Sequence, residues 1–218
     1  MPELPEVETT RCGIAPYIEG KTVEQVIIRQ PRLRWPVTDG LGEQLAGLRI
    51  QSVTRRGKYL LIAADAGTLL LHLGMSGSLR IVPVGQMPGK HDHIDFIFND
   101  RTHLRFNDPR RFGAVLWTTE PVFEHPLLKD LGPEPLSPEF NGDVLFALSR
   151  KRTTPVKSLI MDSHNVVGVG NIYANEALFM AGILPSRQAG RIALPRYEKL
   201  AECIRIVLEQ AIQQGGRR

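Results

Sequence analysis

The sequence predicts an α+β protein, with a β-rich amino-terminal half that begins with a helix and an all-helical carboxy-terminal half. Two patterns of apolar residues predict this division. Between residues 22 and 118 apolar and polar residues mostly alternate and glycines separate the runs, as in strands joined by turns. From residue 139 onward apolar residues recur at three- and four-residue spacing, as on one face of a helix. The proline-rich stretch 132–138 is typical of a linker, so we expect domains at 1–131 and 132–218.

The amino-terminal half is predicted to begin with a helix over about residues 4–18. Pro5 suits the first turn of a helix, the glutamates around it suit the helix dipole, and Pro16 should bend the helix. Asn99 and Asp100 are typical of a hairpin turn. A short helix is expected over 41–48. The other runs are predicted strands, at 22–29, 50–55, 59–63, 68–73, 78–82, 93–98, 103–106 and 113–118.

The carboxy-terminal half is predicted to contain helices at 139–150, 156–161, 172–181 and 194–213. A glycine-rich run from Asp162 to Asn171 joins the second helix to the third, which makes a helix–two-turn–helix pattern. Asn171 is a good amino-terminal cap, and exposed amides at that helix start would bind a phosphate. Lys157 and the run 150–152 add positive charge, which favours a nucleic-acid ligand over a capped turn without one.

Composition limits the class of protein without identifying it. The 218 residues are 42% hydrophobic, which is enough for a core, and the net charge of +4 is compatible with a polyanion ligand but is also common among other proteins. Cys12 and Cys203 lie far apart and form no CxxC pair, so we expect two buried free thiols and no cysteine zinc site. No apolar run is long enough to cross a membrane, so we expect a soluble, cytoplasmic protein.

The amino terminus is a candidate nucleophile. A small residue after the initiator methionine allows its removal, which would give Pro2 a free secondary amine. An α-amino group titrates near ~8 against ~10.4 for lysine, so more of it is neutral and able to attack a sugar carbon. Glu3 and Glu6 are close enough along the chain to act on the same centre as acid or base. Taken alone the signal is weak, because most Met-Pro starts have no chemical role.

Three further segments suit DNA but also have ordinary explanations. Residues 55–58, Arg-Arg-Gly-Lys, could contact phosphate or form a solvated strand edge. Glycines around Met75 could make it protrude from a turn, although methionine usually fills a core. Arg110 and Arg111 beside Phe112, on a loop that begins with Asp-Pro, suit a wedge that fills the space of a flipped nucleotide. A packing cluster of arginine and phenylalanine is the alternative there.

Together these segments resemble the formamidopyrimidine-DNA glycosylases. The start Pro2-Glu3-Leu4-Pro5-Glu6-Val7-Glu8-Thr9 matches the family signature, and the other segments occur in the family's order over essentially the whole chain. The resemblance implies a β-sandwich domain with an amino-terminal helix, followed by a helix–two-turn–helix domain. Family members also carry a lesion-capping loop and a four-cysteine zinc hairpin beyond about residue 216. This chain stops at Arg218, so we expect the zinc finger to be absent and no cofactor to be bound.

The resemblance also assigns roles to individual residues. Pro2 is implied as the nucleophile, Glu3 as the general acid at the sugar, and Glu6 as the carboxylate that orders the same site. Lys58 is implied in base removal and phosphate contact. The resemblance also implies that the trio Met75, Arg110 and Phe112 fills the vacated base stack, with Arg110 facing the orphaned cytosine. Lys157 and Asn171 are implied as phosphate binders. The other implied DNA-binding residues are His72, His91, Arg111 and Gly170.

The activity implied is that of a bacterial base-excision-repair enzyme, a glycosylase and AP lyase. It removes oxidised purines such as 8-oxoguanine and formamidopyrimidines from double-stranded DNA, and cleaves the strand by β,δ-elimination through a Schiff base on Pro2. We expect a monomer at the nucleoid without an obligate protein partner or a membrane. Two alternatives remain open: an endonuclease VIII-like enzyme for pyrimidine lesions, and a non-catalytic module that binds damaged DNA. Comparing the cleavage of duplexes that contain 8-oxoguanine with the cleavage of duplexes that contain thymine glycol distinguishes the first alternative from the oxidised-purine enzyme. A Pro2→Gly change that left all effects on DNA unchanged would support the second.

Overall fold

The computed structural model describes residues 1–216 and divides into two compact units. The first unit contains Met1–Pro2 and Val7–Leu128, and the second contains Glu3–Glu6 and the chain from Lys129 onward. The sequence placed the domain boundary between residues 131 and 132. It gave no sign that the tetrapeptide Glu3–Glu6 packs with residues far along the chain.

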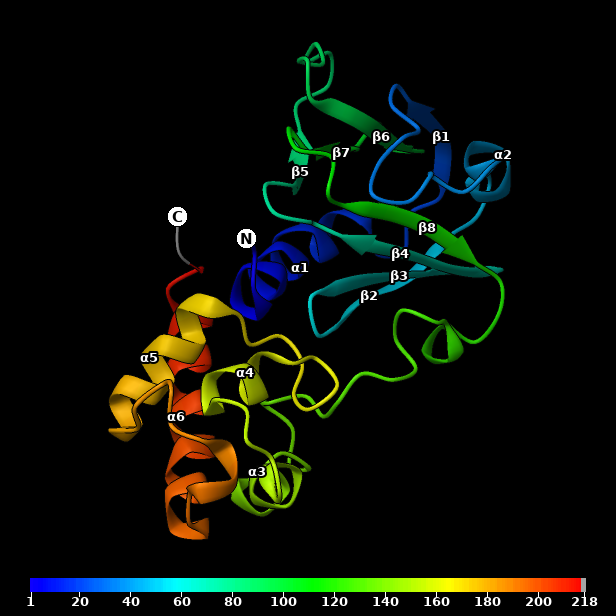
Figure 1. Ribbon diagram of the computed structural model, residues 1–218. Coiled ribbons are helices and arrows are strands. Elements are labelled where there is room, and N and C mark those ends of the chain that lie inside the picture. Colours follow the sequence, from blue (N-terminus) through cyan, green and yellow to red (C-terminus); the bar gives the residue numbers. More distant parts are fainter. Residues whose placement is uncertain (217–218) are drawn as a thin grey trace. The chain divides into compact units, whose positions relative to one another are not determined.

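The first unit is built on two four-stranded antiparallel sheets (Figure 1). One has the order β1-β6-β7-β5, formed by Val23–Ile28, Asp92–Phe98, His103–Asn107 and Ser78–Val82. The other has the order β2-β3-β4-β8, formed by Ile50–Arg56, Tyr59–Ala64, Gly67–His72 and Ala114–Thr118. Apolar residues from both sheets and from helix α1 (Leu4–Ile18) form one buried cluster. The predicted sandwich with an amino-terminal helix is therefore confirmed.

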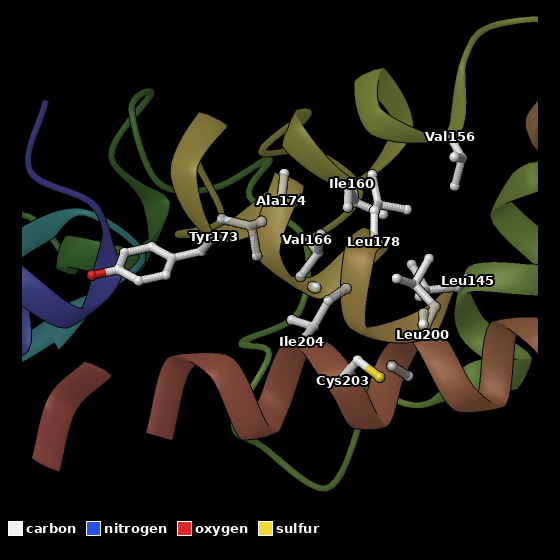
Figure 2. Packing of buried hydrophobic residues seen from close by; sticks show 14 of the residues in the cluster. Leu145, Val156, Ile160, Val166, Tyr173, Ala174, Leu178, Leu200, Cys203 and Ile204 are labelled. Carbon is white, nitrogen blue, oxygen red and sulfur yellow. The ribbon is translucent and has the colours of Figure 1, made fainter. Parts of the chain in front are cut away.

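The second unit packs its helices around a separate apolar core (Figure 2). Its helices are α3 (Gly142–Ser149), α4 (Val156–Met161), α5 (Asn171–Ala181) and α6 (Leu194–Gln213), with a 3-10 turn at Ala189–Arg191. Helix α3 is shorter than the predicted 139–150 because the Asn141 side chain accepts a hydrogen bond from the Val144 amide and caps the helix there. The predicted bounds of α4 and α6 are confirmed.

Three local expectations need correction or detail. Helix α2 (Leu41–Leu45) is shorter than the predicted 41–48, because Gly47 has φ +83° and the chain from there bonds to Val23 of β1. Helix α1 continues through Pro16 to Ile18. Cys203 is buried as expected, but Cys12 is exposed, so the expectation of two buried thiols is wrong for Cys12. Within residues 1–216, none of the helices combines the length and apolar character needed to span a membrane.

Candidate active site and nucleic-acid interface

The carboxylate of Glu3 is bound at the amino terminus of α5. Only 3% of Glu3 is exposed, and its two oxygens accept hydrogen bonds from the amides of Gly170, Ile172 and Tyr173 at 2.8, 3.0 and 3.4 Å. A helix amino terminus carries a partial positive charge and unpaired N–H groups, so it is a good site for a buried carboxylate. The residue that follows Pro2 is therefore fixed to an element 167 positions away in sequence.

Glu6 is held at both of its carboxylate oxygens. Oε2 accepts a hydrogen bond from the Glu3 amide at 2.8 Å, three residues back, which caps the start of α1. Oε1 accepts a hydrogen bond from the hydroxyl of Tyr173 at 2.5 Å. The Tyr173 ring lies at one end of the apolar cluster of the second unit, with its hydroxyl directed away from the cluster (Figure 2). Glu3, Glu6 and Tyr173 thus form one connected group.

Two glycines in the turn before α5 make room for this group. A Cβ on Gly170 would lie 2.3 Å from Cδ of Glu3, and a Cβ on Gly168 would lie 2.6 Å from Cδ1 of Leu4. Gly168 also has φ +81°, and its carbonyl accepts a hydrogen bond from the Leu4 amide at 3.1 Å. The glycine-rich composition of the turn is therefore required by the close approach of residues 3 and 4.

These contacts correct one expectation about the turn. Asn171 does not cap α5, because Asn171 is the first residue of the helix and the capping position is occupied by Gly170, which has no side chain. The amides expected to be exposed for phosphate are bound by Glu3 instead. Gly170 and Asn171 remain predicted DNA contacts, and Asn171 is exposed. Lys157 is partly buried near the start of α4.

In the first unit, the loops at 73–77 and 107–113 are joined by the buried side chain of Asp108. Its Oδ1 accepts a hydrogen bond from the Ser76 hydroxyl at 3.1 Å, and its Oδ2 accepts one from the Gly113 amide at 2.7 Å. The Asp108 carbonyl lies 2.7 Å from Nε2 of the buried His93. A Cβ on Gly74, where φ is +65°, would lie 2.4 Å from the backbone of Phe112, so the loops also touch at their backbones.

The structure brings the predicted trio together on these joined loops. Met75 is 41% exposed and Phe112 is 44% exposed, although both are large and apolar. The guanidinium of Arg110 lies 5.3 Å from the centre of the Phe112 ring. Arg111 is exposed and has φ +57°. Exposed apolar side chains on firmly held loops can insert into a base stack, so this arrangement is compatible with a wedge.

His72, His91 and Lys58 lie in the same unit. Gly57 and Lys58 form the turn between β2 and β3, and the ring of Tyr59 packs against the ring of His72 at 4.9 Å. Burial, with the positive charges of Lys58 and Arg34, lowers the pKa of His72 to about 4. Because Nδ1 of His72 accepts a hydrogen bond from the Gly74 amide at 2.9 Å, its proton is on Nε2, which can donate to a phosphate.

His91 contributes a backbone contact to the same loops, since its carbonyl accepts a hydrogen bond from the Asp108 amide at 3.0 Å. The run 55–58 is not a fully solvated edge. The guanidinium of Arg55 donates to Glu8 at 3.1 Å and to the Gly57 carbonyl at 2.9 Å.

Sequence reasoning missed Asp108 and Tyr173 as positioning residues. The run Asn107-Asp108-Pro109 indicated a turn, but it did not show that the carboxylate would be buried and would reach a second loop. Tyr173 follows the motif at Asn171 by two positions, and nothing near it in sequence indicates Glu6 as its partner.

The residues described do not fit the zinc site of the family. Such a site needs four cysteines, and the chain has two, one exposed in α1 and one buried in α6. Among residues 1–216, no three histidine, cysteine or acidic side chains are grouped so as to hold a metal ion.

Models of two protein domains match the chain. The formamidopyrimidine-DNA glycosylase N-terminal domain matches residues 1–115, and the formamidopyrimidine-DNA glycosylase H2TH domain matches residues 131–218. The formamidopyrimidine-DNA glycosylase of Marinobacter nauticus is 60% identical over 216 residues, which are 99% of this chain and 80% of that protein.

Solved structures of the Lactococcus lactis enzyme Fpg (MutM) are also similar. Its complex with DNA that contains FAPY-dG has a TM-score of 0.92 at 32% identity, and the match covers 99% of this chain and 82% of that one. The complex of the wild-type enzyme with DNA that contains an oxidised pyrimidine has a TM-score of 0.93 at 33% identity, over 100% of this chain and 82% of that one. Both domain models match in order, and a relative is 60% identical over 99% of this chain, so the chain belongs to the formamidopyrimidine-DNA glycosylase family.

Proposed function

We propose that the chain is a DNA glycosylase and AP lyase of base excision repair, which removes oxidised purines from duplex DNA through the amine of Pro2. The observation that carries the proposal is the binding of Glu3 by three amides of α5. This contact fixes the backbone directly after Pro2, and an amine that is held in place reacts faster than one on a free chain end. Membership of the family and the FAPY-dG complex of the L. lactis enzyme support the substrate class.

The reaction needs Met1 to be removed. While Met1 is attached, the Pro2 nitrogen is a tertiary amide without a usable lone pair. Once freed, the nitrogen attacks C1′ of the damaged nucleotide, the bond from C1′ to the base breaks, and the base leaves with the bonding electrons and takes up a proton. Opening of the sugar ring then gives an iminium ion between Pro2 and C1′. We assign the proton transfers at the sugar to Glu3, and the ordering of Glu3 to Glu6 and Tyr173.

Strand cleavage follows from the iminium ion. Loss of a C2′ proton expels the 3′ phosphate, and loss of a second proton expels the 5′ phosphate. Water then releases the sugar remnant and restores the amine of Pro2. The product is a one-nucleotide gap with a phosphate at each end. Met75, Arg110 and Phe112 would fill the space of the extruded nucleotide, and Lys58, Lys157 and Asn171 would contact phosphates.

Borohydride trapping tests the proposal. The protein, with loss of Met1 verified by intact mass, is mixed with a duplex that carries 8-oxoguanine opposite cytosine, and borohydride reduces the iminium ion to a stable crosslink. We expect a covalent complex that maps to Pro2. The matched control is the same chain with an amino-terminal tag left in place, which keeps every side chain but blocks the amine. A crosslink in the tagged form, or none in the free form, would refute Pro2 as the nucleophile.

A second candidate substrate class is the oxidised pyrimidines, because the L. lactis complex with such DNA is also similar. A duplex that carries thymine glycol, compared under the same conditions, distinguishes the two. We expect faster cleavage of 8-oxoguanine, and a reversed order would place the chain with pyrimidine-lesion enzymes. DNA binding without cleavage of either duplex would support the non-catalytic alternative.

A further inference from the structure

The end of α5 and the start of α6 carry an apolar surface beside a basic one. Phe179 is 89% exposed and Leu184 is 69% exposed, whereas Leu178, on the side of α5 that faces the core, is fully buried. A cavity of about 480 Å³ is lined by Phe179, Leu184 and other mostly apolar residues, namely Asn175, Leu178, Gly182, Ile183 and Pro185. A second cavity of about 480 Å³ shares Gly182, Ile183 and Leu184, and is lined by Arg187, Arg191 and Arg196. We call these two joined cavities the α5–α6 groove.

The backbone around the groove is firmly held. Gly182 ends α5 with φ +66°, and its carbonyl accepts a hydrogen bond from the Arg196 guanidinium at 2.6 Å, across the groove. The Arg187 carbonyl accepts a hydrogen bond from the Val156 amide at 2.8 Å. The 3-10 turn at Ala189–Arg191 buries Ala189 and leaves Arg191 exposed. A ligand would therefore meet a site that is formed beforehand, which lowers the cost of ordering it.

The positive charge of the groove is not neutralised. Arg187, Arg191 and Arg196 are exposed, and over residues 1–216 none of them forms an ion pair with a carboxylate. Arg105, by contrast, is buried against two aspartates. Three guanidinium groups at one cavity make a local field that favours an anionic ligand. The function proposed above assigns no role to the groove residues.

We propose that the α5–α6 groove binds an acidic peptide segment of a partner protein. A bulky apolar side chain of the segment would enter the cavity at Phe179 and Leu184, and its carboxylates would pair with the arginines. Phosphate alone would explain the arginines but not the exposed apolar wall. Single-stranded nucleic acid could stack on Phe179, but the rest of the exposed wall is aliphatic, with Leu184 and Pro185, and offers no second ring. The apolar cavity and the basic cavity of the groove together match an acidic peptide with one bulky apolar side chain better than they match a nucleic acid.

Fluorescence anisotropy tests this with a labelled decapeptide that contains four aspartates around one phenylalanine. We expect a Kd on the order of 10 µM at low salt, as for other small interfaces. Replacing the aspartates with asparagine, or the phenylalanine with serine, should weaken binding about tenfold each. In the protein, the double change Arg187→Glu with Arg191→Glu should abolish binding, and Phe179→Ser should weaken it severalfold. Arg101→Glu is the matched control, because Arg101 is exposed in the first unit and should not affect binding.

Two further measurements complete the test. Each variant should keep its circular-dichroism melting curve and its borohydride crosslink to 8-oxoguanine duplex, because the groove lies outside the proposed chemistry. The proposal is overturned if the peptide does not bind at ~1 mM, or if its affinity is the same in the double arginine variant. It is also overturned if a labelled thymidine decanucleotide binds more tightly than the peptide with the same dependence on Arg187 and Arg191, since the groove would then be a nucleic-acid site.

Discussion

Glu3 and Asp108 are both buried carboxylates that bind main-chain amides, but they organise their surroundings in opposite ways. Asp108 is fully buried and joins two loops of the first unit, so that other residues, Met75 and Phe112, remain exposed on a firm base. Glu3 is bound at the start of α5 in the second unit, and the residue that it positions is its own neighbour, Pro2. Asp108 therefore holds a surface in shape, whereas Glu3 holds in place the start of the chain, where the proposed nucleophile Pro2 lies.

This difference teaches which defect each site should produce. Loss of the Asp108 contacts should loosen the proposed wedge of Met75, Arg110 and Phe112 and impair the opening of duplex DNA, while the chemistry on an already accessible sugar survives. Loss of the Glu3 contacts should impair the chemistry on any substrate, whether or not the duplex must be opened.

Gly170→Ala should have the largest effect on activity. The new Cβ would lie 2.3 Å from Cδ of Glu3, so the carboxylate must leave the amides of α5. Misplacing a reacting group by about 1 Å, or removing one oriented donor, costs roughly 10²–10³-fold in rate. We expect a loss of that size in the rate of borohydride crosslinking, on duplex and on single-stranded abasic DNA alike.

The control is Gly13→Ala in α1, where a Cβ meets nothing within 4 Å. It should keep full activity and stabilise the protein by about 0.5–1 kcal/mol, because alanine favours a helix interior. Full activity of Gly170→Ala would contradict the role given to Glu3.

Asp108→Ala should mainly lower stability and duplex opening. The change leaves the buried Gly113 amide and the Ser76 hydroxyl without their acceptor, which costs roughly 2–4 kcal/mol in unfolding free energy. Urea unfolding measures this, with the exposed Asp39→Ala as a control that should change stability by less than about 0.5 kcal/mol. The crosslink to a single-stranded abasic oligonucleotide should survive, whereas the crosslink to 8-oxoguanine duplex should fall. An equal loss on both substrates would remove the distinction between the two carboxylates.

His72 should make stability depend on pH. Its pKa falls from 6.5 in the unfolded chain to about 4 in the folded one. Between these values the unfolded state binds more protons, so stability is fully present above pH 6.5 and is lost as the pH falls toward 4. The total loss of unfolding free energy from this titration is about 3 kcal/mol. Urea unfolding at pH 7.5, 5.5 and 4.5 should show this loss in the wild type relative to His72→Gln, because titrations elsewhere cancel in the difference. Parallel curves for the two proteins would show that His72 does not titrate in this way.

Tyr173→Phe should have the smallest effect. It removes the hydroxyl that donates to Glu6 at 2.5 Å, which costs about 1 kcal/mol of stability and slows the glycosylase severalfold. The matched control is Tyr197→Phe, since Tyr197 is also buried and donates one hydrogen bond, to the Ala189 carbonyl at 2.9 Å. Both changes should destabilise the protein similarly, but only Tyr173→Phe should slow base release. Equal rates in the two variants would show that Tyr173 acts only on stability.

Local sequence patterns predicted the order and type of most elements correctly. Alternation with period two located the strands, and three- and four-residue spacing located α4 and α6, because both patterns report which face of a local segment is buried. The sequence also determined the family, since several weak motifs occurred together in the right order. The predicted element ends were less accurate where a capping side chain or a glycine with positive φ ended the element, as Asn141 does at α3 and Gly47 does after α2.

Only the tertiary structure decided which groups meet at the candidate site. Glu3 and Gly170 are separated by 167 positions in the sequence, and Asp108 and Ser76 are separated by 32 positions. Contacts of this kind depend on how distant segments of the chain pack within one unit, and no local pattern encodes them. The expectation of free amides at α5 was wrong for this reason. The sequence shows that a helix begins after a glycine-rich turn, but whether its amides bind a ligand or a carboxylate from the start of the chain depends on the space that Gly168 and Gly170 leave for residues 3 and 4.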